Sequence, residues 1–91
     1  MKILIKPLAE LGDSLVERSF EFPDGLSVGM VLRELGRHNQ PFRQALFDEQ
    51  DRVRGFINVL VNGKRLDMTQ ESDLPLHDGD ELSLFSYVAG G

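Results

Sequence analysis

The stretch DGDELSLFSYVAGG, residues 78–91, decides the fold because it joins a tight turn to a strand and ends on two glycines. Its first residues, DGD, have the composition of a turn. The run ELSLFSYV that follows alternates between apolar and other side chains, which is the period of a β-strand. The sequence therefore predicts a last strand over residues 81–88.

The two faces of this last strand differ in composition. Leu82 and Leu84 share one face, which we expect to pack against a helix. Phe85 and Tyr87 share the other face, and exposed aromatic side chains are effective anchors for a partner. Two interpretations stay open: this aromatic face is uncovered and docks a partner, or the segment PFRQALF folds over it.

The rest of the chain predicts an α+β fold. Apolar or alternating runs predict strands within KILIKPL, LVERSFEF and GFINVLVNGKRL, and Asn62-Gly63 in the third run is typical of a type I′ hairpin turn. The segment LSVGMVLRELGRHN repeats apolar residues at helical spacing, with Ser27 as the expected N-cap and Gly36 expected just beyond the helix end. PFRQALF adds a short helical turn. One main helix can cover only one face of a four- to five-stranded sheet, so the other face stays open.

Composition excludes several classes of function. The chain has 91 residues, which is one domain, and its net charge of −5 argues against a nucleic-acid partner. No apolar span reaches membrane length and no signal peptide is visible, so we expect a cytoplasmic protein with no membrane partner. The absence of cysteine excludes disulfides and thiolate chemistry.

The charge is unevenly distributed along the sequence. Ten basic and nine acidic residues precede or include Arg65, and no basic residue follows it. Six acidic residues lie beyond that point: Asp67, Glu71, Asp73, Asp78, Asp80 and Glu81. Each is most simply a solvated turn residue, but together they form an acidic segment that can steer the chain toward a basic partner.

No catalytic set or metal site is expected. His38 and His77 lack a second ligand at metal-binding spacing, and the acidic run at 78–81 lacks the periodicity of a calcium loop. The terminal carboxylate of Gly91 is the remaining reactive group, and it becomes an acyl donor only after activation by another protein. Residues 88–91 reach about 13–14 Å when extended, and glycine leaves no Cβ to obstruct a narrow tunnel. The alternative is a chain end without a role.

The C-terminal third, FINVLVNGKRL followed by LPLHDGDELSLFSYVAGG, resembles the MoaD/ThiS family of ubiquitin-like sulfur carriers. The matching features are the Asn62-Gly63 turn, the DGDE turn at 78–81, the last apolar strand and the tail Val88-Ala89-Gly90-Gly91. LSVGMVLREL is similar to the single helix of the family. The resemblance implies a β-grasp fold over residues 1–87, with the first and last strands parallel at the centre of a mixed sheet, and a flexible tail over residues 88–91.

The resemblance also implies a function that is not catalytic. An E1-like enzyme of the MoeB/ThiF type would use ATP to adenylate the Gly91 carboxylate, and a sulfur donor would convert it to a thiocarboxylate. A sulfur-accepting biosynthetic enzyme would then take the sulfur. The tail Val88-Ala89-Gly90-Gly91 would enter the partner's tunnel, and no cofactor would be bound by the chain itself.

Candidate docking residues combine the aromatic face with the acidic turn. They are Phe85, Tyr87, Asp78, Asp80 and Glu81.

The residues before the tail differ from part of the family. Molybdopterin-synthase subunits often carry a proline-containing sequence before Val-Ala-Gly-Gly, where this chain has Ser86-Tyr87. The likeness is therefore greater to carriers used in cysteine synthesis, in thiolation or as small protein modifiers. Two alternatives stay open beside the carrier: a ubiquitin-like modifier conjugated through Gly91, and a non-covalent binding domain.

Overall fold

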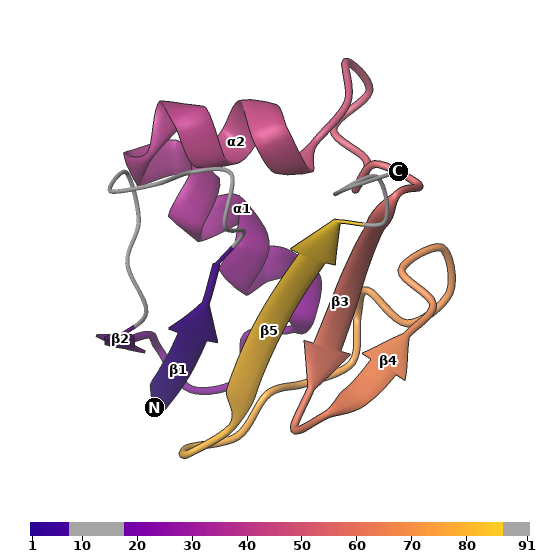
Figure 1. Cartoon of the computed structure of the whole chain (residues 1–91). Helices are drawn as coiled ribbons and strands as arrows, with labels where there is room; N and C mark the ends of the chain where they lie inside the picture. The colour runs from indigo at the N-terminus through magenta and orange to yellow at the C-terminus, as the bar shows by residue number, and fades with distance from the viewer. Residues whose placement is uncertain (8–17, 87–91) are drawn as a thin grey trace.

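A computed structural model describes residues 1–7 and 18–86 and shows a five-stranded sheet with two helices on one side (Figure 1). The strands are β1 (Lys2–Lys6), β2 (Arg18–Glu21), β3 (Ile57–Val61), β4 (Lys64–Leu66) and β5 (Glu81–Ser86). The helices are α1 (Val28–His38) and α2 (Gln40–Leu46). The predicted α+β class is confirmed. The segment PFRQALF forms most of a second helix rather than a single turn.

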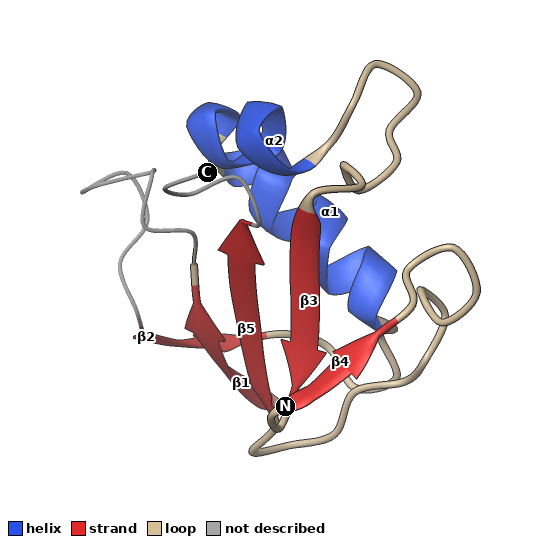
Figure 2. Ribbon diagram, turned by 45° about the vertical axis from the view of Figure 1, so that its right-hand side comes forward, coloured by secondary structure: helices blue, strands red, loops and turns tan. Residues whose placement is uncertain are grey.

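The sheet has the strand order β2-β1-β5-β3-β4 (Figure 2). β1 and β5 pair in parallel, and all other neighbouring strands pair antiparallel. The first and last strands therefore lie side by side in the middle of a mixed sheet, as the resemblance implied. This arrangement is a β-grasp fold.

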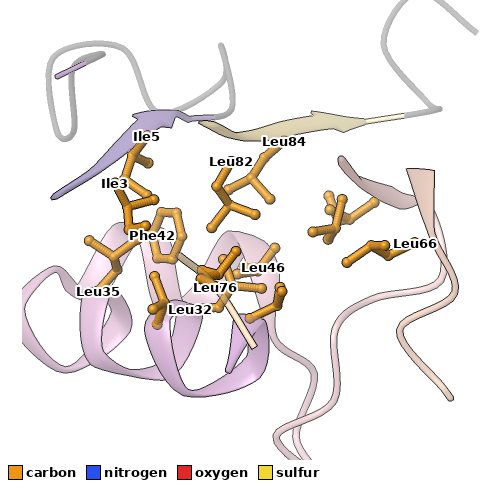
Figure 3. Packing of buried hydrophobic residues seen from close by; sticks show 14 of the residues in the cluster. Ile3, Ile5, Leu32, Leu35, Phe42, Leu46, Leu66, Leu76, Leu82 and Leu84 are labelled. Atoms are coloured by element: carbon orange, nitrogen blue, oxygen red, sulfur yellow. The ribbon is translucent and has the colours of Figure 1, made fainter. Parts of the chain in front are cut away.

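The hydrophobic core lies between the sheet and the helices (Figure 3). Leu82 and Leu84 are 0% and 2% exposed and face the helices, which confirms the predicted face of β5. The fully buried side chains from the other elements are Ile3, Ile5, Val28, Val31, Leu32, Phe42, Leu46 and Val59. Burying one such side chain contributes about 1.5–3 kcal/mol, so this single layer holds the fold together.

Helix α1 begins as predicted but ends later. The Ser27 hydroxyl accepts a hydrogen bond from the Met30 N–H at 3.2 Å, which confirms the N-cap. The prediction that Gly36 lies beyond the helix is wrong, because α1 continues to His38. A Cβ at Gly36 would lie 3.3 Å from the Cβ of Arg43 in α2. Glycine occurs there because the two helices approach closely, not because the helix ends.

The predicted hairpin turn between β3 and β4 is confirmed. Asn62 and Gly63 have φ angles of 52° and 85°, and two positive values define a type I′ turn. Within the described residues, no helix is long and apolar enough to cross a membrane. The predicted boundary between residues 87 and 88 lies outside the described residues.

Candidate functional site: the open face of the sheet

The face of the sheet opposite the two helices, here called the open face, is not covered by either of them (Figure 2). Strand alternation and register decide which residues it carries. Ile5 pairs with Leu82 on the core side, so the neighbouring pair Lys6 and Ser83 points to the open face. Helix α2 contributes to the core instead of folding over this face. Phe85 is 54% exposed, so the structure leaves this side chain uncovered, and the segment PFRQALF does not fold over it.

Three apolar side chains of the open face surround Ser83 and form a patch. Leu60 pairs directly with Ser83 across β3 and β5, and Phe85 lies diagonally from Leu60 on β5. Leu4 completes the patch from β1, and both leucines are half-buried. Ser83 itself is only 5% exposed. We call Leu4, Leu60 and Phe85 the open-face patch.

Charged side chains flank the open-face patch. The Lys6 Nζ lies 3.3 Å from the Glu81 Oε1 across β1 and β5. Arg65 of β4 pairs with Leu60 and is exposed on the far side of the patch. An apolar centre with a polar, charged rim is the usual anatomy of a protein-binding surface.

The acidic turn before β5 is part of the structural framework. The Asp78 Oδ1 accepts a hydrogen bond from the Lys2 N–H at 2.6 Å. The two carboxylate oxygens of Asp80 accept hydrogen bonds from the Asn62 side-chain amide at 2.9 Å and from the His77 N–H at 2.8 Å. The turn therefore joins the start of β5 to β1 and to the β3–β4 hairpin.

The predicted docking residues fall into two separate groups. Asp78, Asp80 and Glu81 lie before or at the start of β5, whereas Phe85 lies near its end, from which the chain continues toward Gly91 (Figure 1). Asp78 and Asp80 precede the strand, whereas Glu81 lies on the same face of β5 as Phe85, four residues or about 13 Å away. The remaining predicted site residues lie outside the described residues: Tyr87, Val88, Ala89, Gly90 and Gly91.

Two members of the open-face patch were not predicted from the sequence. Leu4 and Leu60 occur in runs so apolar that alternation alone does not show which side chains face outward. The signal that identifies them is pairing with β5, because Leu60 stands opposite Ser83. Strand pairing across twenty or more residues is not visible in a local pattern.

The described residues carry no cluster of side chains suited to metal binding. Among them, no group of three or more histidine, aspartate or glutamate side chains could hold a metal ion. The His38 Nε2 contacts the Glu34 Oε1 at 3.1 Å on the surface of α1, and the His77 Nδ1 lies 3.9 Å from the Asp80 Oδ2.

Comparison with protein-family models gives a match to the ThiS family over residues 4–91. The chain belongs to the ThiS family. The match includes the last three residues of β1, the other four strands, both helices and the terminal Gly-Gly. This family comprises ubiquitin-like sulfur carriers, so the resemblance expected from the sequence is confirmed.

Two relatives of this ThiS-family protein are named as modifiers. Small archaeal modifier protein 3 of Haloferax volcanii is 35% identical over 68 residues, which are 75% of this chain and 73% of the relative. Ubiquitin-related modifier 1 of Laccaria bicolor is 38% identical over 64 residues, or 70% of this chain. The matched part spans only 52%, about half, of the Laccaria protein.

Solved structures share the whole fold. SAMP1 from Haloferax volcanii superposes with a TM-score of 0.82 and 25% identity, covering 100% of both chains. A chain of the BexX/CysO complex from Amycolatopsis orientalis superposes with a TM-score of 0.73 and 24% identity, covering 98% of this chain and 99% of that one. The second likeness concerns the fold alone.

Proposed function

We propose that this protein is a sulfur carrier whose Gly91 carboxylate is activated by a partner and converted to a thiocarboxylate. The observation that carries the proposal is the family match, which extends to Gly91 itself. The fold adds support, because β5 ends at Ser86 beside an uncovered apolar patch. A partner docked on that patch would receive the residues that follow.

The proposed chemistry has two steps. A Gly91 carboxylate oxygen attacks the α-phosphorus of ATP in the partner's active site, which forms an acyl-adenylate and releases pyrophosphate. Hydrosulfide then attacks the acyl carbon and releases AMP. The product is a thiocarboxylate at Gly91, which a biosynthetic enzyme can use as a sulfur source. The chain acts as a cosubstrate in this scheme and catalyses neither step.

The proposed partner is an E1-like adenylating enzyme that binds the open face. Phe85 would act as the main anchor, because it is the most exposed member of the open-face patch and the nearest to the tail. Tyr87, two residues further along the chain, would act as a second aromatic anchor. Asp78, Asp80 and Glu81 would act mainly through long-range attraction, since the carboxylates of Asp78 and Asp80 already accept hydrogen bonds within the chain.

Mass spectrometry tests the carrier proposal. Incubation with ATP, sulfide and the adenylating enzyme is expected to change the intact mass by one oxygen replaced with one sulfur, located on Gly91. A variant lacking Gly91 is the control and should stay unmodified. If the enzyme turns over ATP with this protein and the mass is unchanged, or if the sulfur is located elsewhere, the proposal is wrong.

A protein modifier is the second candidate, favoured by the names of the two relatives. In that case the lysine amine of a target attacks the same acyl-adenylate and forms an isopeptide bond. No lysine or arginine follows Arg65, so trypsin would leave residues 66–91 attached to the target lysine. Finding this branched peptide in the native host would establish conjugation, and its absence beside a detected thiocarboxylate would favour the carrier.

A further inference from the structure

Asn58 of β3 carries a hydrogen-bond acceptor that the fold leaves unused. Its side-chain oxygen Oδ1 is buried, and no donor in the described part of the chain reaches it. Among the described residues, it is the one buried side-chain oxygen or nitrogen without a hydrogen-bond partner. Buried polar groups are nearly always paired, because an unpaired one loses its bonds to water and gains nothing in return. The exposed surroundings of Asn58 suggest what the oxygen is for.

The side chain of Asn58 belongs to the open face. Val59 is buried in the core, so its neighbour Asn58 points to the opposite side of the sheet, where it pairs with Phe85. Directly opposed side chains on one face have Cβ atoms about 4.5–5.5 Å apart, so the Phe85 ring is a close neighbour of the Asn58 amide. Leu60 follows on the same face of β3. The unused oxygen therefore lies in largely apolar surroundings, beside the open-face patch.

Asn58 and Phe85 lie at the end of β5 from which the chain continues toward Gly91. Phe85 is the last but one residue of β5, and Gly91 follows six residues later. Six extended residues span about 20 Å, so an enzyme that holds Gly91 in its active site has its surface within that distance of this pair. Phe56, which directly precedes β3, is a second exposed aromatic side chain, at 39%. An unused acceptor thus occurs where a partner that takes up the tail would dock.

We infer that Asn58 is a docking residue for the adenylating enzyme and that its Oδ1 accepts a hydrogen bond from that enzyme. The inference rests on the carrier proposal and adds the chemistry of the contact, which is an apolar enzyme surface with one N–H or O–H donor. Side chains at an interface commonly change rotamer on binding. The exposed Phe85 ring would turn toward the enzyme and uncover the oxygen for the donor.

Such a contact would give selectivity as well as affinity. An apolar surface that lacks the donor would cover Asn58 and leave its oxygen unpaired, which disfavours that complex. An enzyme with the donor in place satisfies an acceptor that the free protein cannot satisfy. The open-face patch alone would accept many apolar surfaces, and Asn58 would distinguish among them.

Adenylation kinetics test the inference, with the E1-like adenylating enzyme of the native host and the full-length protein as its substrate. The rate of pyrophosphate release is measured as a function of protein concentration. Asn58→Leu replaces the amide by an apolar group of similar size. We expect KM to rise about 10-fold or more, equivalent to about 1.4 kcal/mol, with kcat unchanged, because the lost contact contributes equally to the docked complex and to the transition state.

Two further variants identify the atom that makes the contact. Asn58→Asp keeps an oxygen acceptor in the same place, so its KM should stay within about 3-fold of the wild type. Gln50→Leu makes a comparable change at an exposed position outside the sheet, and its KM should equal that of the wild type.

A double-mutant cycle with Phe85 tests the burial of the oxygen without any partner. Asn58→Leu removes an unpaired buried acceptor, so we expect its midpoint of urea unfolding to equal or exceed that of the wild type. In Phe85→Ala, water reaches the amide, and the same substitution should raise the midpoint less. An unfolding midpoint at or above that of the wild type also shows that a raised KM does not come from loss of folded protein.

The outcomes separate this inference from the carrier proposal. If the wild-type protein is not adenylated, the carrier proposal fails and this inference fails with it. If the wild type is adenylated, an unchanged KM for Asn58→Leu overturns this inference alone. Equal increases in KM for Asn58→Leu and Asn58→Asp would show that the oxygen is not the group used. A lower unfolding midpoint for Asn58→Leu in both backgrounds would show that Asn58 supports the fold instead.

Discussion

Asn62 links two turns that lie 15 or more residues apart in the sequence. Its side-chain amide donates to the Asp80 Oδ1 at 2.9 Å, and its Oδ1 accepts a hydrogen bond from the Glu81 N–H at 2.9 Å. Its own N–H donates to the Glu81 carbonyl at 2.8 Å. One residue in a left-handed conformation thus holds the β3–β4 hairpin against the start of β5.

We expect Asn62→Asp to lower the free energy of unfolding by about 1–3 kcal/mol at neutral pH, because it places a carboxylate against that of Asp80 and removes a donor. Aspartate tolerates the same positive φ, so the turn itself should form. Urea unfolding measures the effect. The double variant Asn62→Asp/Asp80→Asn exchanges the two groups and should recover most of the loss. Equal stability of single and double variants would show that the pairing has no role.

Asp48 supports the loop after α2 and makes stability depend on pH. Its Oδ1 accepts hydrogen bonds from the backbone N–H groups of Arg52 at 3.0 Å and Gln50 at 2.8 Å. The Arg52 N–H bond, above all, holds the pKa of Asp48 below its ordinary value, with the Gln50 bond and the charges of Arg52 and Arg54 acting in the same direction. A carboxyl whose pKa is lowered by folding stabilises the fold while it is ionised.

The resulting pH dependence has a definite sign. The stabilisation by Asp48 should be complete above the unfolded pKa, about 3.9, and should disappear as the pH falls through the lower folded value. Asp48→Asn should therefore melt below the wild type at pH 6, with a difference that shrinks toward about pH 2. Melting curves at several pH values measure it. A difference that grows on acidification would contradict this assignment.

At the scale of elements, the contact between α1 and α2 depends on Gly36. A Cβ there would lie 3.3 Å from the Arg43 Cβ and 3.6 Å from its Cα, so only a small group fits between the helices. The sequence placed this glycine at a helix end because glycine is common there. The true reason is packing against a second helix, which no local pattern in α1 contains.

We expect Gly36→Leu to lower the free energy of unfolding by about 1–3 kcal/mol, because the larger side chain forces α1 and α2 apart. Gly36→Ala should stay within about 1 kcal/mol of the wild type, since its gain in helix propensity opposes the tight contact. Met30→Leu, at a position of α1 that is 53% exposed, is the control and should have almost no effect. If Gly36→Leu leaves the free energy of unfolding unchanged, α2 can shift away from α1 without cost and the close contact does not stabilise the fold.

The elements themselves followed from local patterns more readily than their contacts did. Alternation in ELSLFSYV identified β5 and its core face, and helical spacing identified α1. The contribution of Phe42 and Leu46 to the core was not predicted. It depends on where α2 docks, and a seven-residue helix has too short a pattern to show which of its sides is buried.

At the scale of the whole molecule, an aromatic side chain on the open face and one in the core are expected to contribute differently to stability and to binding. Phe85 is 54% exposed and Phe42 is fully buried. We expect Phe85→Ala to cost less than about 1.5 kcal/mol of stability, against about 3–5 kcal/mol for Phe42→Ala. Binding to the adenylating enzyme should weaken about 10-fold or more in Phe85→Ala, as measured by titration calorimetry. Tyr87→Ala is expected to behave like Phe85→Ala.

Unchanged partner binding by Phe85→Ala would remove the open-face patch from the proposed interface. Equal destabilisation by Phe85→Ala and Phe42→Ala would show that the aromatic is a core residue. The sequence correctly placed Phe85 on the uncovered side of β5, and it grouped Phe85 with the acidic turn because both are near the same end of the chain. In the structure Asp78 and Asp80 precede β5 at one end of the strand, and Phe85 lies near its other end.

The last prediction concerns the thinness of the tail at Gly90. Among the described residues the buried core extends from Ile3 to Leu84, and we expect the melting curve of Gly90→Val to overlay that of the wild type. In the adenylating enzyme the branched side chain would stand one residue from the reacting carbon, in a tunnel shaped around backbone alone. A misplacement of about 1 Å at a reacting group can cost on the order of 100-fold in rate, so adenylation should fall by at least that order.

The rate of pyrophosphate release measures adenylation. Gly90→Ala adds one methyl group, and its adenylation rate should lie between those of the wild type and Gly90→Val. Normal activation of Gly90→Val would show that the glycine pair is a chain end without a role in the partner's tunnel.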